Sequence, residues 1–305
     1  MTRPRFRSRL AGALALAATA SVLAACGSSP TTASDPSVSV SALPVDAQLH
    51  AALPAAVAAA GVIKVGIEAQ YPPFESLAAD NTTIVGLDAD LGAAIGQVLG
   101  VKWQFTNASF DSLLPSLKAG RYDLVQAAVT DTKVREKEYD FVDYFLTGQS
   151  IVVKKGNPDG IHGIADLCGR PVAVLRGSTQ ETMLNGFNTA QCKSKPIQIT
   201  SLQTDKDALL QVQTGRADAS FTQDAVGAYN TKTIGNGNQF EVANSSALMP
   251  TPVGIVFDKS QGALRDAVKG ALEKIIASGE YDKLLAKYGL SGGALKTITV
   301  DGAVG

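Results

Sequence analysis

The chain has 305 residues, with 27 lysines and arginines against 28 aspartates and glutamates and a formal net charge of −1. Nucleic-acid binding needs a basic face, so this balance predicts no nucleic-acid partner. Two histidines and three cysteines stand at spacings that fit no zinc pattern, and we expect no metal and no other cofactor.

The first residues predict export. Arginines precede an apolar run from Leu10 to Leu23, and small residues end it, as in a secretory signal peptide over 1–25. The run is shorter than the ~20 residues of a membrane-spanning helix, and no later run reaches that length. Leu23-Ala24-Ala25-Cys26 resembles the lipobox of bacterial lipoproteins, which implies cleavage before Cys26 and its acylation. The alternative is an ordinary signal that is cut beside Cys26 by chance.

Residues 26–45 are rich in serine, threonine and proline, which predicts a flexible tether to the lipid anchor. The alanine-rich stretch 46–61 predicts a helical lead-in that begins at Asp46 and ends at Gly61, with a division at Pro54 left open.

From residue 62 the pattern alternates between strands and helices. The predicted strands are 62–67, 101–105, 123–129, 151–154, 172–175, 197–200, 217–221 and 253–257. The first predicted helix starts at 88 or 90 and ends at 99. The others cover 110–119, a short segment through 135, a segment from 180 through 187, 206–214 and 261–276. This alternation predicts an α/β fold with mainly parallel sheets covered by helices on both faces.

With Cys26 assigned to the anchor, Cys168 and Cys192 remain as an even pair in an oxidising compartment. We predict a disulfide between them, because a bond that closes a loop of about 25 residues stabilises a fold by ~3–4 kcal/mol. Two free thiols are the alternative.

Two predicted strand-to-helix turns carry hydroxyl side chains where an anion could bind. The first contains Thr130 and leads to Arg135, and the second contains Ser178 and Thr179. Free N–H groups and the helix dipole suit a carboxylate or a phosphate at such turns, and open α/β sheets bind ligands at this edge. Arg135 is expected about one turn into its helix, where its guanidinium could bind a carboxylate through two hydrogen bonds. The alternative is that the hydroxyls are ordinary helix caps.

Five segments of the chain stand in an order that is typical of one family. They are Val65-Gly66-Ile67 with Tyr71-Pro72-Pro73-Phe74-Glu75, Gly86-Leu87-Asp88-Ala89-Asp90-Leu91, the turn from Thr130 to Arg135, Gly177-Ser178-Thr179-Gln180 and Gly215-Arg216-Ala217-Asp218-Ala219. Together they resemble the polar amino acid class of bacterial solute-binding proteins, family three, the extracytoplasmic receptors of ATP-driven importers. The resemblance covers about Leu53 to Leu290.

The resemblance implies a two-lobed periplasmic-binding-protein fold, type II-like, with two mainly parallel sheets joined by two crossover strands. We expect the lobes to be joined near residues 150–153 and 247–253. The expected parts are a signal peptide over 1–25, a tether over 26–45, a lead-in over 46–61, a first lobe over 62–150 and 251–296, a second lobe over 151–250 and a C-terminal tail over 297–305.

The resemblance also implies a ligand held between the lobes. From the first lobe it implies Glu68 facing the ligand's side chain, Tyr71 and Phe110 stacking on it, and the backbone of Ala128 with Thr130 and Arg135 holding its α-carboxylate. From the second lobe it implies Arg176, Ser178, Thr179 and Gln180. Tyr71 and Phe110 could instead be core residues, and Arg176 a solvated surface charge.

One position departs from the family pattern. The family places an aspartate after the Gly-Arg-Ala-Asp-Ala strand to bind the ligand's ammonium group, whereas this chain has Gln223, with Asp224 one residue later. Either Asp224 is presented by a small shift, or a neutral amide meets the ammonium. A charge-assisted hydrogen bond is about twice as strong as a neutral one, so the choice matters for affinity.

The sequence thus predicts a monomeric, lipid-anchored receptor on the outer face of a membrane, which binds a polar amino acid or related zwitterion and delivers it to the permease of an ABC importer. The alternatives are a prephenate or arogenate dehydratase on the same scaffold, with Glu68 and Asp224 as its acid–base candidates, and a ligand-sensing protein. Glu68 favours a cationic or amide side chain and Arg176 an acidic or amide one, so the ligand stays open.

Overall fold

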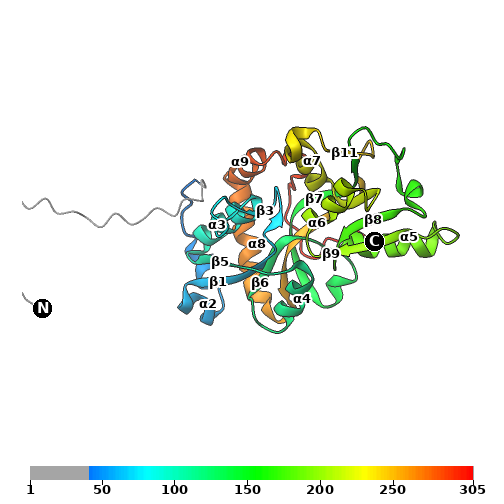
Figure 1. Cartoon of the computed structure of the whole chain (residues 1–305). Helices are drawn as coiled ribbons and strands as arrows, with labels where there is room; N and C mark the ends of the chain where they lie inside the picture. The colour runs from blue at the N-terminus through cyan, green and yellow to red at the C-terminus, as the bar shows by residue number, and fades with distance from the viewer. Residues whose placement is uncertain (1–40, 305) are drawn as a thin grey trace, which may run out of the picture. The chain divides into compact units, whose positions relative to one another are not determined.

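The computed structural model describes residues 41–304 (Figure 1). The predicted signal peptide, Cys26 and most of the predicted tether lie outside these residues. Within residues 41–304, no helix combines the length and the apolar character needed to cross a membrane. Strands and helices alternate along the described chain, as the sequence predicts.

The strands of the main sheet are parallel at its two ends and antiparallel in its middle. The order is β5-β1-β6-β12-β7-β10-β8-β9, and β11 also pairs with β7. The bounds are β1 Val62–Ile67, β5 Lys102–Asn107, β6 Leu124–Thr130, β7 Tyr139–Lys154, β8 Pro171–Leu175, β9 Gln198–Leu202, β10 Ala219–Gln223, β11 Phe240–Val242 and β12 Leu248–Asp258. A small second sheet contains β2 Gln70–Tyr71, β3 Glu75–Leu77 and β4 Ile84–Val85. We call the elements around β1 the first lobe, those around β8 the second lobe, and β7 and β12 the crossover strands.

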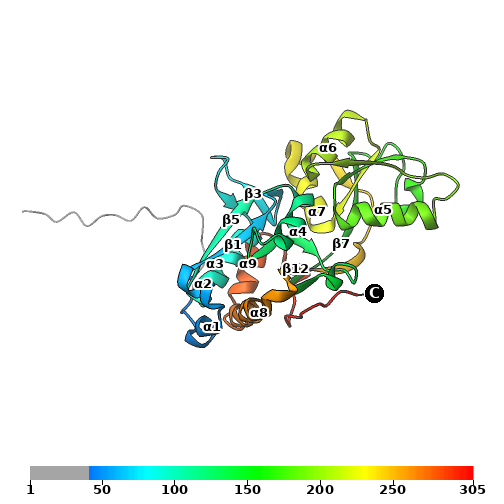
Figure 2. The same ribbon diagram turned by 90° about the horizontal axis from the view of Figure 1, so that it is seen from below.

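Helices cover both faces of each lobe (Figures 1 and 2). Successive side chains of a strand point to opposite faces, and the core follows this rule: Leu124 of β6 packs in one hydrophobic cluster of the first lobe and Val125 in the other. The helix bounds are α1 Ala47–Ala51, α2 Ala55–Ala60, α3 Leu87–Leu99, α4 Phe110–Lys118, α5 Thr179–Ala190, α6 Asp205–Thr214, α7 Asp224–Thr233, α8 Gly262–Ala277 and α9 Glu280–Lys287. Short 3-10 helices are η1 Arg135–Lys137, η2 Ile164–Leu167, η3 Ile234–Gly237, η4 Lys259–Gln261 and η5 Ser291–Gly293.

The late amphipathic helix α8 belongs to the first lobe. Its apolar residues Leu264, Val268 and Leu272 are fully buried in one cluster with Ile63 of β1 and Ile95 of α3. The chain therefore leaves the first lobe, builds the second and returns, as expected from the crossover strands. The boundaries of the lobes at single residues stay a prediction.

The second lobe has its own core, and the predicted disulfide lies in it. Cys168 and Cys192 are bonded, with their Cα atoms 5.1 Å apart. Cys192 is buried in a cluster with Val174 and Leu184, and Cys168 packs against the same cluster. The prediction of this disulfide is confirmed.

Several elements differ from the sequence prediction. The lead-in divides at Pro54 into α1 and α2, since proline cannot continue a helix. The crossover strand β7 is 16 residues long, whereas only 151–154 was expected. The helix α7 and the strand β11 were not expected. In α7, Gly227 permits close contact with β7, because a Cβ added there would lie 2.3 Å from Ser150 Oγ.

The turn before Arg135 also differs from the sequence prediction. The expected helix is instead the three-residue 3-10 helix η1, which Arg135 begins, and β7 follows at Tyr139. The helix-dipole argument therefore holds for the second turn alone, where Ser178 is the N-cap of the 12-residue helix α5.

Candidate functional site

Arg135 links the two lobes. Its Nη1 donates to the carbonyl oxygen of Thr130 at 2.8 Å and to Thr179 Oγ1 at 3.0 Å, and its Nη2 donates to the carbonyl oxygen of Gly177 at 3.2 Å. Thr130 ends β6 in the first lobe, while Gly177 and Thr179 lie at the start of α5 in the second. The predicted anion-binding turns therefore meet at one guanidinium.

The guanidinium of Arg135 forms no ion pair with any carboxylate in residues 41–304. Burial lowers the pKa of Arg135 to about 10, and the charge of Asp131 opposes this shift. Arg135 therefore stays cationic at neutral pH. A half-buried cation that bonds to neutral acceptors alone is suited to receive an anion in two parallel hydrogen bonds.

The start of α5 surrounds this cation with buried polar groups. Ser178 Oγ accepts a hydrogen bond from the Glu181 N–H at 3.1 Å. Its hydroxyl is therefore an ordinary helix cap, as the alternative to anion binding predicts. The hydroxyl of Thr179 instead faces Arg135. Gln180 Nε2 donates to Gln149 Oε1 of β7 at 2.5 Å, which fixes the buried amide against the crossover strand.

Gln223 reaches from the second lobe to the first. Its Nε2 donates to the carbonyl oxygen of Ala128 at 2.9 Å and lies 3.5 Å from Thr130 Oγ1. The Ala128 N–H, which the resemblance assigns to the ligand, donates to Asp88 Oδ2 at 3.1 Å. Gln223 therefore lies with Ala128 and Thr130 at the junction of the lobes, and which of the two candidates meets an ammonium group stays a prediction.

The carboxylate of Asp224 is engaged at a crossover strand. Its Oδ1 accepts from Thr147 Oγ1 at 2.5 Å and from the Gly148 N–H at 3.0 Å, both in β7. The guanidinium of Arg176 is exposed and donates to Gln203 and Ser201 of its own lobe. The structure does not bring these two side chains into contact with the Arg135 cluster, and their roles in binding stay predictions.

Tyr71 and Glu68 follow β1 at the same junction. The hydroxyl of Tyr71 lies 3.1 Å from Thr222 Oγ1 and accepts from the Gln223 N–H at 3.2 Å, so Tyr71 also connects the lobes. Glu68 is 3% exposed, and no group of the described residues donates to its Oε2. Burial, followed by the charge of Asp205, raises the pKa of Glu68 to about 8. Phe110 is half-buried at the start of α4, and its role in stacking stays a prediction.

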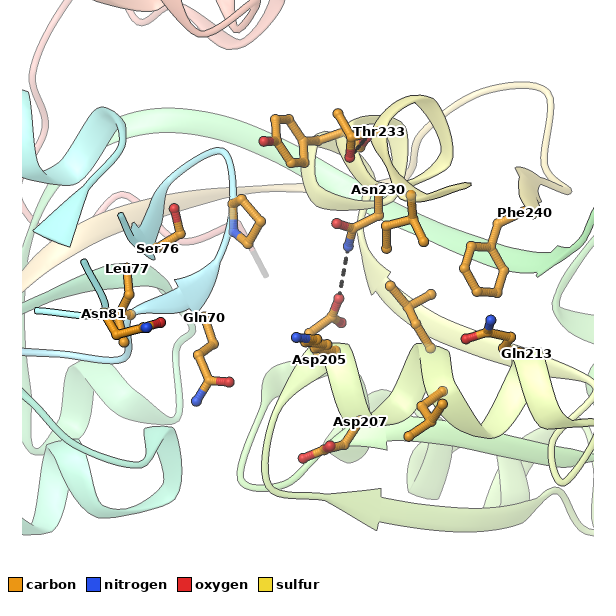
Figure 3. A pocket seen from close by; sticks show the side chains of 17 residues that line it. Gln70, Ser76, Leu77, Asn81, Asp205, Asp207, Gln213, Asn230, Thr233 and Phe240 are labelled. Atoms are coloured by element: carbon orange, nitrogen blue, oxygen red, sulfur yellow. Dashed lines mark hydrogen bonds between the residues drawn. The ribbon is translucent and has the colours of Figure 1, made fainter. Parts of the chain in front are cut away.

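Asp205 is a candidate site residue that the sequence prediction missed. It begins α6, is 2% exposed, and accepts from Asn230 Nδ2 of α7 at 3.2 Å (Figure 3). Burial raises the pKa of Asp205 to about 6. In the sequence, an aspartate after Thr204 is typical of an ordinary helix start, so no local signal sets it apart.

Asp205 borders a cavity of about 480 Å³ between the lobes. The small sheet of the first lobe contributes Gln70, Ser76 and Leu77, and the second lobe contributes residues of α6 and α7 that include Asn230 (Figure 3). A volume of this size is typical of a site for a small molecule. Among residues 41–304, no group of three or more histidine, cysteine, aspartate or glutamate side chains is arranged to hold a metal ion.

Known amino acid-binding proteins are similar to this chain over most of its length. The histidine-binding periplasmic protein of Salmonella typhimurium is 32% identical over 231 residues, which are 74% of this chain and 86% of that protein. The arginine-binding protein ArgT of Corynebacterium glutamicum is 30% identical over 251 residues, 81% of each chain.

Solved structures give the same fold. A mutant of ArgBP from T. maritima has a TM-score of 0.69 and 30% identity, over 76% of this chain and 97% of that one. An ancestral arginine-binding protein bound to arginine has a TM-score of 0.68 and 34% identity, over 75% and 98%. An ancestral amino acid-binding protein described as a precursor of cyclohexadienyl dehydratase has a TM-score of 0.68 and 31% identity, over 76% and 97%.

The family model of the bacterial extracellular solute-binding proteins, family 3, matches residues 63–291, from β1 to the segment after α9. The match spans both lobes and both crossover strands. The chain therefore belongs to family 3 of the bacterial extracellular solute-binding proteins.

Proposed function

We propose that this protein binds an α-amino acid between its two lobes, outside the cytoplasm, and delivers it to an ABC importer. The observation that carries the proposal is Arg135, a cation at the junction of the lobes that is bonded to neutral acceptors from both. A ligand carboxylate would bind its guanidinium in two parallel hydrogen bonds and would also meet the N-terminus of α5. The same carboxylate would then contact both lobes, so its binding would favour the closed arrangement.

The relatives suggest which amino acids to test first. The two curated relatives described above are named for histidine and arginine, and one solved neighbour is described as bound to arginine. We therefore take arginine and histidine as first candidates, with the α-carboxylate at Arg135 and the side chain toward Glu68.

Replacing Arg135 by lysine tests the site. A lysine keeps the charge and loses the planar fork, so Arg135→Lys is expected to weaken amino acid binding at least tenfold, or ~1.4 kcal/mol. Calorimetry on the purified exported domain gives the dissociation constant, and thermal unfolding checks the fold. Arg121→Lys, at an exposed arginine of the turn before β6, is the matched control and should leave affinity unchanged. Equal affinities in wild type and Arg135→Lys would contradict the carboxylate assignment.

Binding in this way needs no catalysis. Of the two acid–base candidates for a dehydratase, Asp224 is engaged by β7, which leaves Glu68. The same protein preparation, incubated with prephenate, should yield no product, while thermal unfolding with arginine at about 100 times its dissociation constant should show a gain of ~2.7 kcal/mol. Turnover of prephenate would favour the enzyme instead.

We also propose that Cys26 is acylated and holds the protein at a membrane. The support is the sequence Leu23-Ala24-Ala25-Cys26 after an apolar run, followed by a tether rich in serine and proline. Several acyl chains hold a protein stably because each buried CH₂ contributes ~0.8 kcal/mol. Cells fed a labelled fatty acid should label the wild type and not Cys26→Ala, and equal labelling would overturn the anchor.

A further inference from the structure

Two buried carboxyl groups from opposite lobes lie near each other beside the cavity: Asp205 lines it, and Glu68 directly precedes Ala69 and Gln70, which line it. Glu68 follows β1 in the first lobe, and Asp205 begins α6, which packs against the β2 strand that starts at Gln70. Tyr71 of β2 contacts Thr222, which also bonds to Asp205, and the charge of Asp205 acts on the pKa of Glu68. Both side chains are at most 3% exposed.

The two acids are not neutralised by a buried base of the described chain. Neither forms an ion pair within residues 41–304. Asp205 bonds to neutral groups, the amide of Asn230 and the hydroxyl of Thr222, and Glu68 Oε2 accepts no hydrogen bond from the described residues. On the outer wall of the cavity, Lys206 is exposed and is followed by Asp207, so these two neighbours contribute opposite charges.

Behind Glu68, the first lobe buries Glu75 beside Asp88. Burial and the charge of Asp88 raise the pKa of Glu75 well above its ordinary value. Neither Glu75 nor Asp88 lines the cavity, whereas Asp205 and the two residues that follow Glu68 do. Burial and the charge of Asp205 raise the pKa of Glu68, which a cation placed between the two groups would reverse.

We infer that Asp205 is a second carboxylate for the ligand's side chain, and that Glu68 and Asp205 together select an amino acid with a cationic side chain. This inference rests on the proposed function, because it takes the α-carboxylate to lie at Arg135. It assigns a specificity role to the second lobe through the first residue of α6.

The balance of charge supports this assignment. An amino acid with a cationic side chain brings one carboxylate, which Arg135 matches, and two cations, which Glu68 and Asp205 match. Gln223, where the family resemblance places an aspartate, contributes no charge. With a neutral amino acid, one of the two buried acids would have no counter-charge and would stay protonated, so it would contribute no ion pair to binding.

Arg135 is not among the residues that line the cavity beside the two acids, so the two ends of the proposed ligand would lie at different places. Asp205 borders the 480 Å³ cavity, while Arg135 lies where β6 and α5 meet. A guanidinium could donate to two carboxylates at once because it presents five N–H groups in one plane. The ligand class that we assign is therefore an α-amino acid ending in a guanidinium, with an ammonium as the weaker match.

The test compares L-arginine with L-citrulline, in which a neutral urea group replaces the guanidinium at nearly the same length. Calorimetry at pH 7.5 is expected to show that the wild type binds arginine at least tenfold more tightly than citrulline, a difference of ~1.4 kcal/mol. Asp205→Asn should weaken arginine at least tenfold and change citrulline less than about threefold. Asp282→Asn removes the same charge at an exposed position of α9, outside the cavity lining, and should change the affinity for both ligands less than about threefold.

The outcomes separate the two proposals. A wild type that binds glutamine or citrulline as tightly as arginine overturns the role of Asp205 and leaves the amino acid receptor intact. Equal losses for arginine and citrulline in Asp205→Asn also overturn it. Thermal unfolding shows whether Asp205→Asn is folded. If it is not, two measurements still test the inference: the affinities of the wild type for arginine and citrulline, and those of Glu68→Gln, which should lose affinity for arginine and keep it for citrulline. A wild type that binds no amino acid overturns the proposed function and this inference together.

Discussion

At the scale of single residues, Gln223 shows how a departure from the family pattern fits this chain. The amide donates to the carbonyl oxygen of Ala128 across the lobes. An ionised carboxylate at this position could accept hydrogen bonds and could not donate one. Gln223, which stands where the family has an aspartate, therefore adds a direct contact between the lobes.

Gln223→Glu is expected to destabilise the ligand-free protein by about 1–3 kcal/mol at pH 8, because a buried carboxylate would face the Ala128 carbonyl without a donor. The loss should shrink toward pH 4, where a protonated glutamate can donate. Urea unfolding at both pH values measures it. Gln198→Glu is the matched control, since Gln198 is exposed and also donates to a carbonyl oxygen, that of Gly169. A loss equal to that of the control would contradict the role given to Gln223.

At the scale of elements, the C-terminal segment packs against the crossover strand β7. Ile298 is buried in the core of the first lobe, and Val300 forms a bridge with Val142. Asp143 of β7 accepts from Thr299 Oγ1 at 2.9 Å. The sequence predicts only a tail here, because a short segment with alternating polar residues gives no sign of the strand that it covers.

The same segment also contacts the anion-binding turn. The Ala303 N–H donates to Glu136 Oε1 at 3.0 Å, in the 3-10 helix that Arg135 begins. Asp131, four residues before Arg135, is fully buried, and none of the described groups donates to its carboxylate. Burial, then the charges of Asp143, Glu136 and Asp301, raises the pKa of Asp131 to about 8.

This buried acid predicts a pH dependence of stability. The unfolded chain releases the Asp131 proton near its ordinary pKa of 3.8, while the folded protein keeps it up to about 8. The folded state binds more protons throughout this interval, so the free energy of unfolding should fall as the pH rises from about 4 to 8. In Asp131→Asn, the free energy of unfolding should fall less steeply with pH, and the variant should be more stable than the wild type at pH 8.

Urea unfolding at several pH values measures this slope. The control is Asp282→Asn, which removes one charge at an exposed position of α9. Buried carboxyls with raised pKa values, such as Glu68 and Asp143, contribute to the slope in every variant, so the comparison concerns the difference that Asp131 makes. Parallel slopes in the wild type and Asp131→Asn would show that the pKa of Asp131 is not raised.

At the scale of the whole molecule, the alternation of strands and helices was readable from the sequence because each element repeats its apolar residues at its own period. The apolar residues of α8 stand at helical spacing, and the structure buries that face. The strand β7 was mostly missed because Asp140 and Asp143 resemble exposed positions. In the structure Asp140 pairs with Lys259 and Arg265, and Asp143 meets the C-terminal segment.

The α/β class, the disulfide, the order of family motifs and the two turns that carry Thr130 and Thr179 could be predicted from the sequence. These predictions rest on local patterns and spacings, which can be read from the sequence without knowing the long-range contacts. Three features became visible in the fold alone: Arg135 joins the two turns, Asp224 is engaged by β7, and Asp205 lies near Glu68. The physical reason is that Glu68 and Asp205 stand 137 positions apart (205 − 68) in the chain. Their meeting depends on how the two lobes close, and no local periodicity encodes it.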